Sequence, residues 1–331
     1  MPKQQTSGLR AALAAFAAVG LMAGAGAHAE QPVPGYPSKS IRMIVPFPAG
    51  GTTDVVARLI AKGITTAWGQ SVVIDNRGGA AGMIGSAEGA RAAPDGYTLV
   101  MGNNQTHATN ASLFAKPQFD ITNGVTPIAM LTRTKHVIVV RSDSPIKTYQ
   151  DLIAAGKDHH LSFGSPSAGS SSHIISDAIR RATGMDATHI PYKGAAPLMV
   201  DLLSGQIDFS TATYGSAASY IHDGKLRPLA VGAEQRDPEL PNVPTFDELG
   251  LKGLSLYSWV GLYAPANTPE PIVRAWSDAV ARILKDPDVI STLKTAGFEV
   301  WCKPYTEMKT FHPEEIKRWA DLVKAGGISL D

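Results

Sequence analysis

The chain has little of what would narrow its function at once. Cys302 is the single cysteine among 331 residues, so no disulfide can form within the chain and stability must come from packed cores. The chain also has almost no net charge, because its 30 lysines and arginines are balanced by 29 aspartates and glutamates. No block of basic residues interrupts the sequence. We therefore expect no nucleic-acid partner.

Long hydrophobic runs are missing apart from one near the start. Residues 1–29 have the parts of an export signal, with Lys3 and Arg10 before an Ala/Gly-rich stretch and an A-x-A cleavage site that ends at Ala29. The stretch is about 15 residues long, shorter than the roughly 20 that a membrane-spanning helix needs. We predict a signal peptide that is cleaved after Ala29.

Enzyme signatures are missing as well. The glycines at positions 79, 82 and 85 do not make G-x-G-x-x-G, and no Gly-rich turn is followed by a Walker lysine. The stretch "GSPSAG" has Pro166 where the serine of G-x-S-x-G would stand, and "DHH" at 158–160 has no partner cluster with metal-ligand spacing. We predict no catalytic residue, no metal and no cofactor.

The rest of the chain alternates short β-type runs with helix-type runs, which is typical of an α/β protein with mostly parallel sheets. Three β-α units fill residues 41–103, and a second series begins at the long β-branched run 127–143 and continues to a strand at 207–213. After another strand at 256–265 come amphipathic helices that we expect to pack on the first half. The length is consistent with two domains.

Two loops share one design. The segments "PFPAGGTTD" (46–54) and "FGSPSAGSSSH" (163–173) place glycines and hydroxyl residues where a strand ends and a helix starts. Free backbone N–H groups and the positive end of the helix dipole point to the same spot there. Because ligands bind at the carboxyl ends of strands in open α/β sheets, the presence of one such loop in each half favours anion binding at these loops over two ordinary Gly/Ser turns.

Several residues of these segments have a second interpretation. Thr53, Ser171 and Ser172 could instead serve only as N-caps of their helices. Asp54 either favours its helix through the dipole or accepts a hydrogen bond from a ligand. His107, in "GNNQTHATN", and His173 either donate to an oxyanion or are bonded locally.

Seven blocks in a fixed order carry a family resemblance over nearly the whole mature length. They are "YPSKSIRMIVPFPAGGTTDVVAR", "NRGGAAGMIG", "PDGYTLVMGN", "FGSPSAGSSSHI", "IPYKGAAPLMVDLLSGQIDF", "GKLRPLAV" and "GLYAPANTPEPIV". The chain resembles the Bug-type periplasmic solute-binding proteins of tripartite tricarboxylate transporters. The resemblance implies a type II periplasmic binding protein fold (Venus flytrap), with two doubly wound α/β domains joined by two crossing strands. We expect domain 1 to comprise 30–132 plus 258–331, and domain 2 to comprise 133–257.

The resemblance also implies the function and the site. We expect a monomer, not an enzyme, that captures a small organic carboxylate (a di- or tricarboxylate, an aromatic acid or similar) in the periplasm for the membrane subunits of a tripartite transporter. The alternatives are a sensor that signals to a membrane kinase, or a protein that binds an acidic amino acid. The predicted ligand-binding residues, from both loops and from the turns at 103–107 and 192–193, are Phe47, Ala49, Thr52, Thr53, Asp54, Asn103, Asn104, His107, Ser165, Ser167, Gly169, Ser170, Ser171, Tyr192 and Lys193.

The sequence departs from the family pattern in two places. Many relatives have a Phe-Asp pair after "GQIDF", where this chain has Thr211 and Ala212. The change disfavours a ligand whose amine needs a carboxylate there. The second departure, Trp301 and Cys302 in "FEVWCKPYT", suggests no function.

Overall fold

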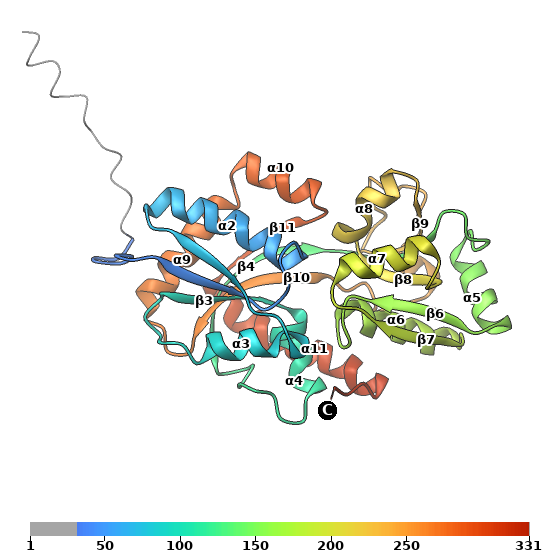
Figure 1. Ribbon diagram of the computed structural model, residues 1–331, viewed down its shortest axis with the longest axis horizontal. Coiled ribbons are helices and arrows are strands. Elements are labelled where there is room, and N and C mark those ends of the chain that lie inside the picture. The colour runs from blue at the N-terminus through green and yellow to red at the C-terminus, as the bar shows by residue number, and fades with distance from the viewer. Residues whose placement is uncertain (1–31, 331) are drawn as a thin grey trace, which may run out of the picture.

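The computed structural model describes residues 32–330 of the chain, so the predicted signal peptide and its cleavage after Ala29 lie outside the described residues. Two lobes lie side by side along the long axis of the molecule (Figure 1). Each lobe is built on one β-sheet with helices packed against it.

The first lobe contains both the beginning and the end of the described chain. Its sheet has the strand order β11-β4-β10-β3-β1-β2. The strands are β1 (Ile41–Val45), β2 (Val72–Asn76), β3 (Thr98–Asn103), β4 (Val125–Thr134), β10 (Ser258–Pro265) and β11 (Glu299–Pro304). The helical elements are α2 (Thr52–Trp68), η1 (Ala80–Gly82), α3 (Met83–Ala90), η2 (Gln105–Thr109), α4 (Asn110–Leu113), α9 (Glu270–Ile283), α10 (Pro287–Thr295) and α11 (Tyr305–Gly326).

The second lobe is formed by the middle of the chain. Its sheet has the order β7-β6-β8-β5-β9. The strands are β5 (His136–Arg141), β6 (Leu161–Ser165), β7 (Ala187–Pro191), β8 (Phe209–Thr213) and β9 (Leu226–Gly232). The helical elements are α5 (Tyr149–Asp158), α6 (Ser171–Thr183), α7 (Ala195–Ser204), α8 (Tyr214–His222) and η3 (Asp247–Leu249).

The sheets are mixed, which corrects the expectation of mostly parallel sheets. Strands β1, β2 and β3 run parallel to one another, as do β6, β7 and β8. Strands β4, β10 and β11 of the first sheet, and β5 and β9 of the second, make antiparallel pairs. The parallel part of each sheet comes from local β-α units. In the antiparallel part, β4, β5, β9 and β10 border a crossing between the lobes, and β11 pairs with β4 at the edge of the first sheet.

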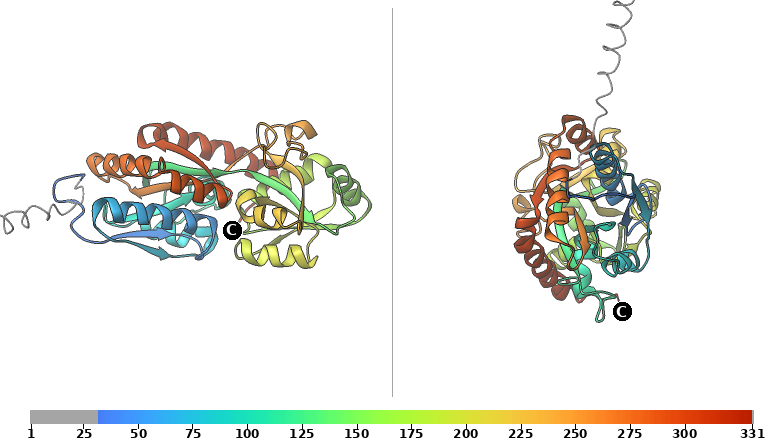
Figure 2. Two further views of the ribbon diagram at one scale, coloured as in Figure 1. Left: turned by 90° about the horizontal axis from the view of Figure 1, so that it is seen from above. Right: turned by 90° about the vertical axis from the view of Figure 1, so that its left-hand side faces the viewer.

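The chain crosses between the sheets in two places, and both lie next to these antiparallel strands (Figure 2). The β-branched run 127–143, which reads as one continuous alternation, belongs to two sheets, because β4 ends at Thr134 and β5 begins at His136. The return lies between Gly232 at the end of β9 and Ser258 at the start of β10. A β-type sequence pattern shows which side chains of a strand are buried, but it does not show which sheet the strand joins.

Helix α2 shows how the sequence pattern places the elements of the first lobe. Its apolar residues recur at helical spacing, and Val56, Ile60 and Ile64 are at most 1% exposed. Burial of each such side chain contributes about 1.5–3 kcal/mol. At its end Trp68 packs edge-on against Trp276 of α9 with ring centroids 4.7 Å apart, so the first and last parts of the lobe share one core.

Helix α11 joins the two lobes. It packs against β4 and η2 of the first lobe and against α6 of the second. Trp319 and Val323 of α11 belong to the same buried cluster as Ile174 and Ile175 of α6. The expectation that the last helices pack on the first half therefore holds for α9, while α11 spans both halves.

Two glycines meet where the lobes touch. The start of α8 in the second lobe and the turn between α10 and β11 in the first lobe approach so closely that a Cβ on Gly215 would lie 2.6 Å from the carbonyl oxygen of Ala296. A Cβ on Gly297 would lie 2.4 Å from Cα of Gly215, and Gly297 also has a positive φ of 74°. Only glycine fits at either position without a backbone shift.

Candidate functional site

The first loop, residues 46–54, connects β1 to α2. Helix α2 begins after Gly51, whose backbone is extended, and no side chain caps the free N–H groups. Thr53 is buried inside the first turn and does not cap the helix. Ala49 is exposed, and Phe47 and Thr52 are half-buried. The loop thus presents backbone and a threonine at the positive end of a helix of 17 residues.

Asp54 holds this loop from within. The side chain is 2% exposed and accepts hydrogen bonds from Gly50 N–H (2.9 Å), Asn76 Nδ2 (2.9 Å) and Arg58 (2.8 and 3.1 Å). Burial alone would raise the pKa of Asp54, but the bonds from Arg58, Gly50 and Asn76 outweigh it and hold the pKa below its ordinary value. Its charge is thus neutralised within the first lobe.

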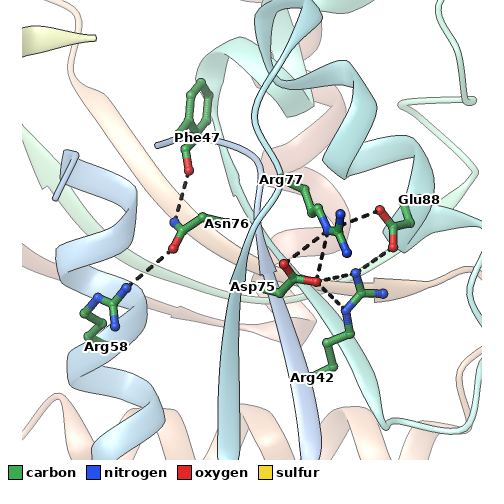
Figure 3. Close-up of polar contacts among 7 residues, drawn as sticks. All are labelled: Arg42, Phe47, Arg58, Asp75, Asn76, Arg77 and Glu88. Atoms are coloured by element: carbon green, nitrogen blue, oxygen red, sulfur yellow. Dashed lines mark hydrogen bonds and ion pairs between the residues drawn. The ribbon is translucent and has the colours of Figure 1, made fainter. Parts of the chain in front are cut away.

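The end of β2 supplies the support behind the loop (Figure 3). Asn76 donates from Nδ2 to the carbonyl oxygen of Phe47 as well as to Asp54. The preceding Asp75 accepts from Arg42 of β1 and from Arg77, and Arg42 also pairs with Glu88 of α3. Three elements of the first lobe are therefore tied together behind the first loop.

Residues 79–82 cover the side of the first loop. Four consecutive residues have positive φ there, including Ala80 (47°) and Ala81 (54°), which are not glycine. A Cβ on Gly82 would lie 3.2 Å from the Phe47 ring and 2.5 Å from the Thr106 methyl group. Left-handed alanines cost roughly 1–2 kcal/mol each, so tertiary contacts must hold this turn in place.

The second loop, residues 165–171, connects β6 to α6. Ser170 caps the helix, because its side chain accepts from His173 N–H at 3.3 Å; Ser171 occupies the first helical turn instead. Ser165 is fully buried and donates from Oγ to Ser167 O at 2.8 Å. Gly169 has a φ of 74°, which lets the chain turn into the helix.

Three histidines surround the second loop. His136 Nδ1 donates to Leu256 O at 2.9 Å, which leaves Nε2 to accept from Ser171 Oγ at 2.9 Å. The His173 and His189 rings stack with centroids 3.6 Å apart. Nδ1 of His173 accepts from Gly169 N–H at 3.0 Å, and His189 Nε2 donates to Ser165 Oγ at 2.7 Å, because the hydroxyl proton of Ser165 is used by Ser167 O.

Burial keeps these histidines neutral. Desolvation lowers the pKa of His136 to about 4 and that of His189 to about 3, where repulsion from His173 adds to it. The pKa of His173 is lowered by burial too, although Asp177 opposes the shift. The second loop therefore depends on neutral imidazoles, whereas the first depends on an ionised carboxylate.

The turn after β3 lies between the two loops. Asn103 and Thr106 bond each other reciprocally, with Thr106 N–H to Asn103 Oδ1 and Asn103 N–H to Thr106 Oγ1 both at 3.1 Å. Asn104 is buried and donates to Tyr257 O at 3.1 Å, so it ties the turn to the second crossing. His107 is fully buried and stacks on Tyr263 at 4.0 Å. Asn104 and His107 thus lie inside the protein.

Tyr192 and Lys193 lie on the second lobe. The Tyr192 hydroxyl donates to Asp201 Oδ2 at 2.8 Å, which commits it to the neighbouring helix α7. Lys193 is exposed. Tyr192 N–H donates to Ser165 O and Gly194 N–H to Pro166 O, so the backbone of this turn braces the second loop.

The structure joins the second loop to the turn after β3 through a residue that the sequence did not single out. Gln105 donates from Nε2 to Ala168 O at 2.8 Å and accepts from Ser167 Oγ at 2.8 Å. Asn76, His136 and His189 are further supports absent from the prediction. For Gln105 there was a signal, since it stands inside the polar segment "GNNQTHATN", but helix and strand patterns cannot show which lobe a side chain reaches.

Two hollows lie away from both loops. One of about 590 Å³ lies between residues 32–34 and α9, with Glu270, Arg274 and Asp278 on its wall. Another of about 130 Å³ lies beside Trp259, Trp301 and Glu315.

Among residues 32–330 no group of three or more His, Cys, Asp or Glu side chains is placed to hold a metal ion. No helix in this range has both the length and the apolar character needed to cross a bilayer.

Two α/β lobes, two chain crossings and a donor-rich loop in each lobe define a bilobed binding protein of the Venus flytrap class. The family model described as "Tripartite tricarboxylate transporter family receptor" matches residues 56–328. The chain therefore belongs to this receptor family, as the sequence resemblance predicted. Its members are binding proteins rather than enzymes, which confirms the expectation that the chain is not an enzyme.

Solved structures agree with this assignment. The periplasmic binding protein BugD is 33% identical, with a TM-score of 0.82 over 89% of this chain and 99% of that one. A protein of R. palustris with adipate is 33% identical, with a TM-score of 0.83 over 89% and 99% of the two chains. MatC from Rhodopseudomonas palustris with bound malate is 34% identical, with a TM-score of 0.80 over 87% and 100%.

Proposed function

We propose that this protein binds a small organic carboxylate between the first and second loops and delivers it to the membrane subunits of a tripartite transporter. The observation that carries the proposal is the chemistry of the two loops. Each lies at the start of a long helix and offers backbone N–H groups and hydroxyls, and such groups stabilise anions. Relatives at 33% and 34% identity have been solved with adipate and malate.

The ligand contacts would come from the accessible parts of the loops. Thr52 and the N–H groups of the first turn of α2 supply the first loop, because the N–H groups of Gly50 and Gly51 are already bonded to Asp54 and Pro48 O. The residues between Ser165 and Ser171 supply the second loop. Hydrogen bonds to a charged group contribute roughly 1.5–3 kcal/mol each, so a few donors from each loop offset the desolvation of a carboxylate without a buried arginine. Asn104 and His107 brace the site in this proposal, because both are buried in the first lobe.

The same geometry favours a plain carboxylate over an amino acid. An amine would need an available carboxylate, but Asp54 is already bonded to Arg58, Gly50 and Asn76. Thr211 and Ala212, where many relatives have a Phe-Asp pair, are both at most 1% exposed. A di- or tricarboxylate or an aromatic acid therefore fits the donor set better.

Membership of the family supports the proposed location and partner. BugD is described as a periplasmic binding protein, and residues 1–29 have the pattern of an export signal. We therefore infer that this protein works in the periplasm and meets its transporter at the membrane surface.

Thermal unfolding with a panel of C4 to C6 dicarboxylates, aromatic acids and amino acids tests the proposal. A true ligand at 100 times its dissociation constant should stabilise the protein by about 2.7 kcal/mol. Stabilisation by nucleotides or metal ions, and by no carboxylate, would contradict it.

The isosteric substitution Thr52→Val should weaken the best carboxylate by about tenfold, since it removes one hydrogen bond to a charged group. Thr66→Val is the matched control at the far, exposed end of α2, where the hydroxyl bonds only Lys62 O, and it should leave the affinity unchanged.

A further inference from the structure

Gln105 is the first residue of the π-helical turn η2 and is 4% exposed. It belongs to the first lobe, but both ends of its side-chain amide reach the second loop. Nε2 donates to Ala168 O and Oε1 accepts from Ser167 Oγ, each at 2.8 Å. One planar group thus satisfies a donor and an acceptor of the opposite lobe at once.

Neighbouring residues of the first lobe also contact the second loop. Thr109, one turn further along η2, donates from Oγ1 to Gly169 O at 3.2 Å. A Cβ on Gly169 would lie 2.4 Å from the Leu113 side chain, so the two lobes are in close contact there. The backbone from 167 to 169 therefore rests on the first lobe.

The base from which Gln105 extends is fixed on every side. Asn103 and Thr106 bond each other, Asn104 bonds Tyr257 O, and His107 stacks on Tyr263 and accepts at its carbonyl oxygen from His312 Nε2 at 2.8 Å. Within residues 103–107, Gln105 is the one whose side chain bonds the second loop. Single π-helical turns of this kind occur frequently at functional sites.

We propose that Gln105 is a positioning residue for ligand capture: it sets where the second loop stands relative to the first when both face one carboxylate. The uncharged, planar amide donates to Ala168 O and accepts from Ser167 Oγ, an ionised carboxylate at this position could not donate, and asparagine would be one methylene too short. The residue acts through the loop. The expected effect of Gln105 on ligand binding rests on the proposed function, whereas its expected effect on the position of the second loop does not.

Hydrogen exchange of the ligand-free protein tests the positioning directly. Gln105→Leu keeps the size of the side chain but removes both bonds, and it should speed amide exchange in residues 166–170 by about tenfold while residues 48–54 stay unchanged. Thr109→Val should produce a smaller change of the same kind. Gln118→Leu, the same substitution at an exposed site of the first lobe, is the matched control and should change neither loop.

Gln105→Glu separates positioning from a general loss of structure. At about pH 7.5 the buried carboxylate would face Ala168 O without a proton, and the second loop should exchange as fast as in Gln105→Leu. At about pH 5 the carboxyl, whose pKa burial would raise, can donate again, and protection should return toward the wild-type value. Wild type at each pH is the reference, because His173, His189 and Asp177 lie near the loop in both proteins.

Binding of adipate and malate completes the test. The dissociation rate should rise about tenfold in Gln105→Leu with a smaller change in the association rate, because the loop must then be ordered by the ligand. Equal exchange in wild type and Gln105→Leu, or no recovery of Gln105→Glu at low pH, would overturn the proposal. A wild type that binds no carboxylate would contradict the proposed function and leave the exchange result to decide on Gln105.

Discussion

The two loops that the sequence makes look alike are held in opposite ways. The first is braced entirely inside its own lobe, through Asp54, Arg58 and Asn76. The second is braced partly by its own lobe, through His136 and His189, and partly by the other lobe, through Gln105. The first loop is therefore preformed whatever the angle between the lobes, whereas the second has its full support only when the lobes stand as they do here.

This difference bears on how a bilobed protein closes on a ligand. A ligand shifts an equilibrium between open and closed states only by its differential affinity for the two. If opening removes the support of the second loop, that loop accounts for most of the difference in ligand affinity between the open and closed states. The first loop then has the same conformation in both states.

The largest expected effect comes from forcing the lobes apart at their glycine contact. Gly297→Ala would place a Cβ 2.4 Å from Cα of Gly215 and put alanine at a φ of 74°, and it should destabilise the protein by about 3 kcal/mol. Small-angle scattering should show a larger radius of gyration, and hydrogen exchange should rise in the second loop but not in the first.

Gly184→Ala is the matched control for this substitution. Gly184 has a similar φ of 68° with nothing within 4 Å of the added Cβ, so it should cost about 1 kcal/mol through backbone strain alone. Equal exchange changes in both loops of Gly297→Ala would contradict the difference in their support.

A smaller effect is expected from Asp54→Ala, which removes the brace of the first loop. Loss of the hydrogen bonds from Gly50 N–H and Asn76 should lower the free energy of unfolding by about 2 kcal/mol. The pair with Arg58 adds little, since that side chain is 55% exposed and the solvent screens it. Urea denaturation measures the change.

Asp321→Ala, on the exposed face of α11, is the control and should stay within about 0.5 kcal/mol of wild type. If Asp54→Ala left stability unchanged and altered only which acids bind, Asp54 would be a ligand contact rather than a brace.

A third effect is a pH dependence that differs between the loops. The folded pKa of His136 is about 4, below its ordinary 6.5, so its contribution to stability is present above pH 6.5 and declines as the pH falls toward 4, by up to about 1.4 kcal/mol per pH unit. The pKa of Asp54 lies below its ordinary 3.8, so its contribution is retained until the pH falls below about 4.

Acidification from about pH 7 to about pH 5 should therefore loosen the second loop and spare the first. Hydrogen exchange in each loop, and urea denaturation of wild type against His136→Gln, measure it. The variant should have a flatter stability profile between those two values. A first loop that loosened as early as the second would contradict this account.

Much of the fold was predictable because it depends on local patterns. The structure has the buried apolar face of α2, formed by Val56, Ile60 and Ile64, where the sequence predicted it. It also has the two strand-to-helix loops at the predicted positions, 46–54 and 163–173. Helix α8 and strands β9 and β11 were missed. The segment "YGSAASYIH" is short and weakly amphipathic, and "EVWCKP" has no alternation. The runs at 127–143 and 256–265 were predicted as β-structure, but their antiparallel direction was missed, because strand direction depends on a partner far away in the sequence.

The sequence by itself determined most of the elements, the two donor-rich loops and the family, because these rest on the spacing of apolar residues and on motifs that are contiguous along the chain. Only the tertiary structure decided what each polar side chain holds. Asp54 and Asn76 are 22 residues apart, and Gln105 and Ser167 are 62 apart. Hydrogen bonds at such separations depend on how the lobes pack, which no local pattern records.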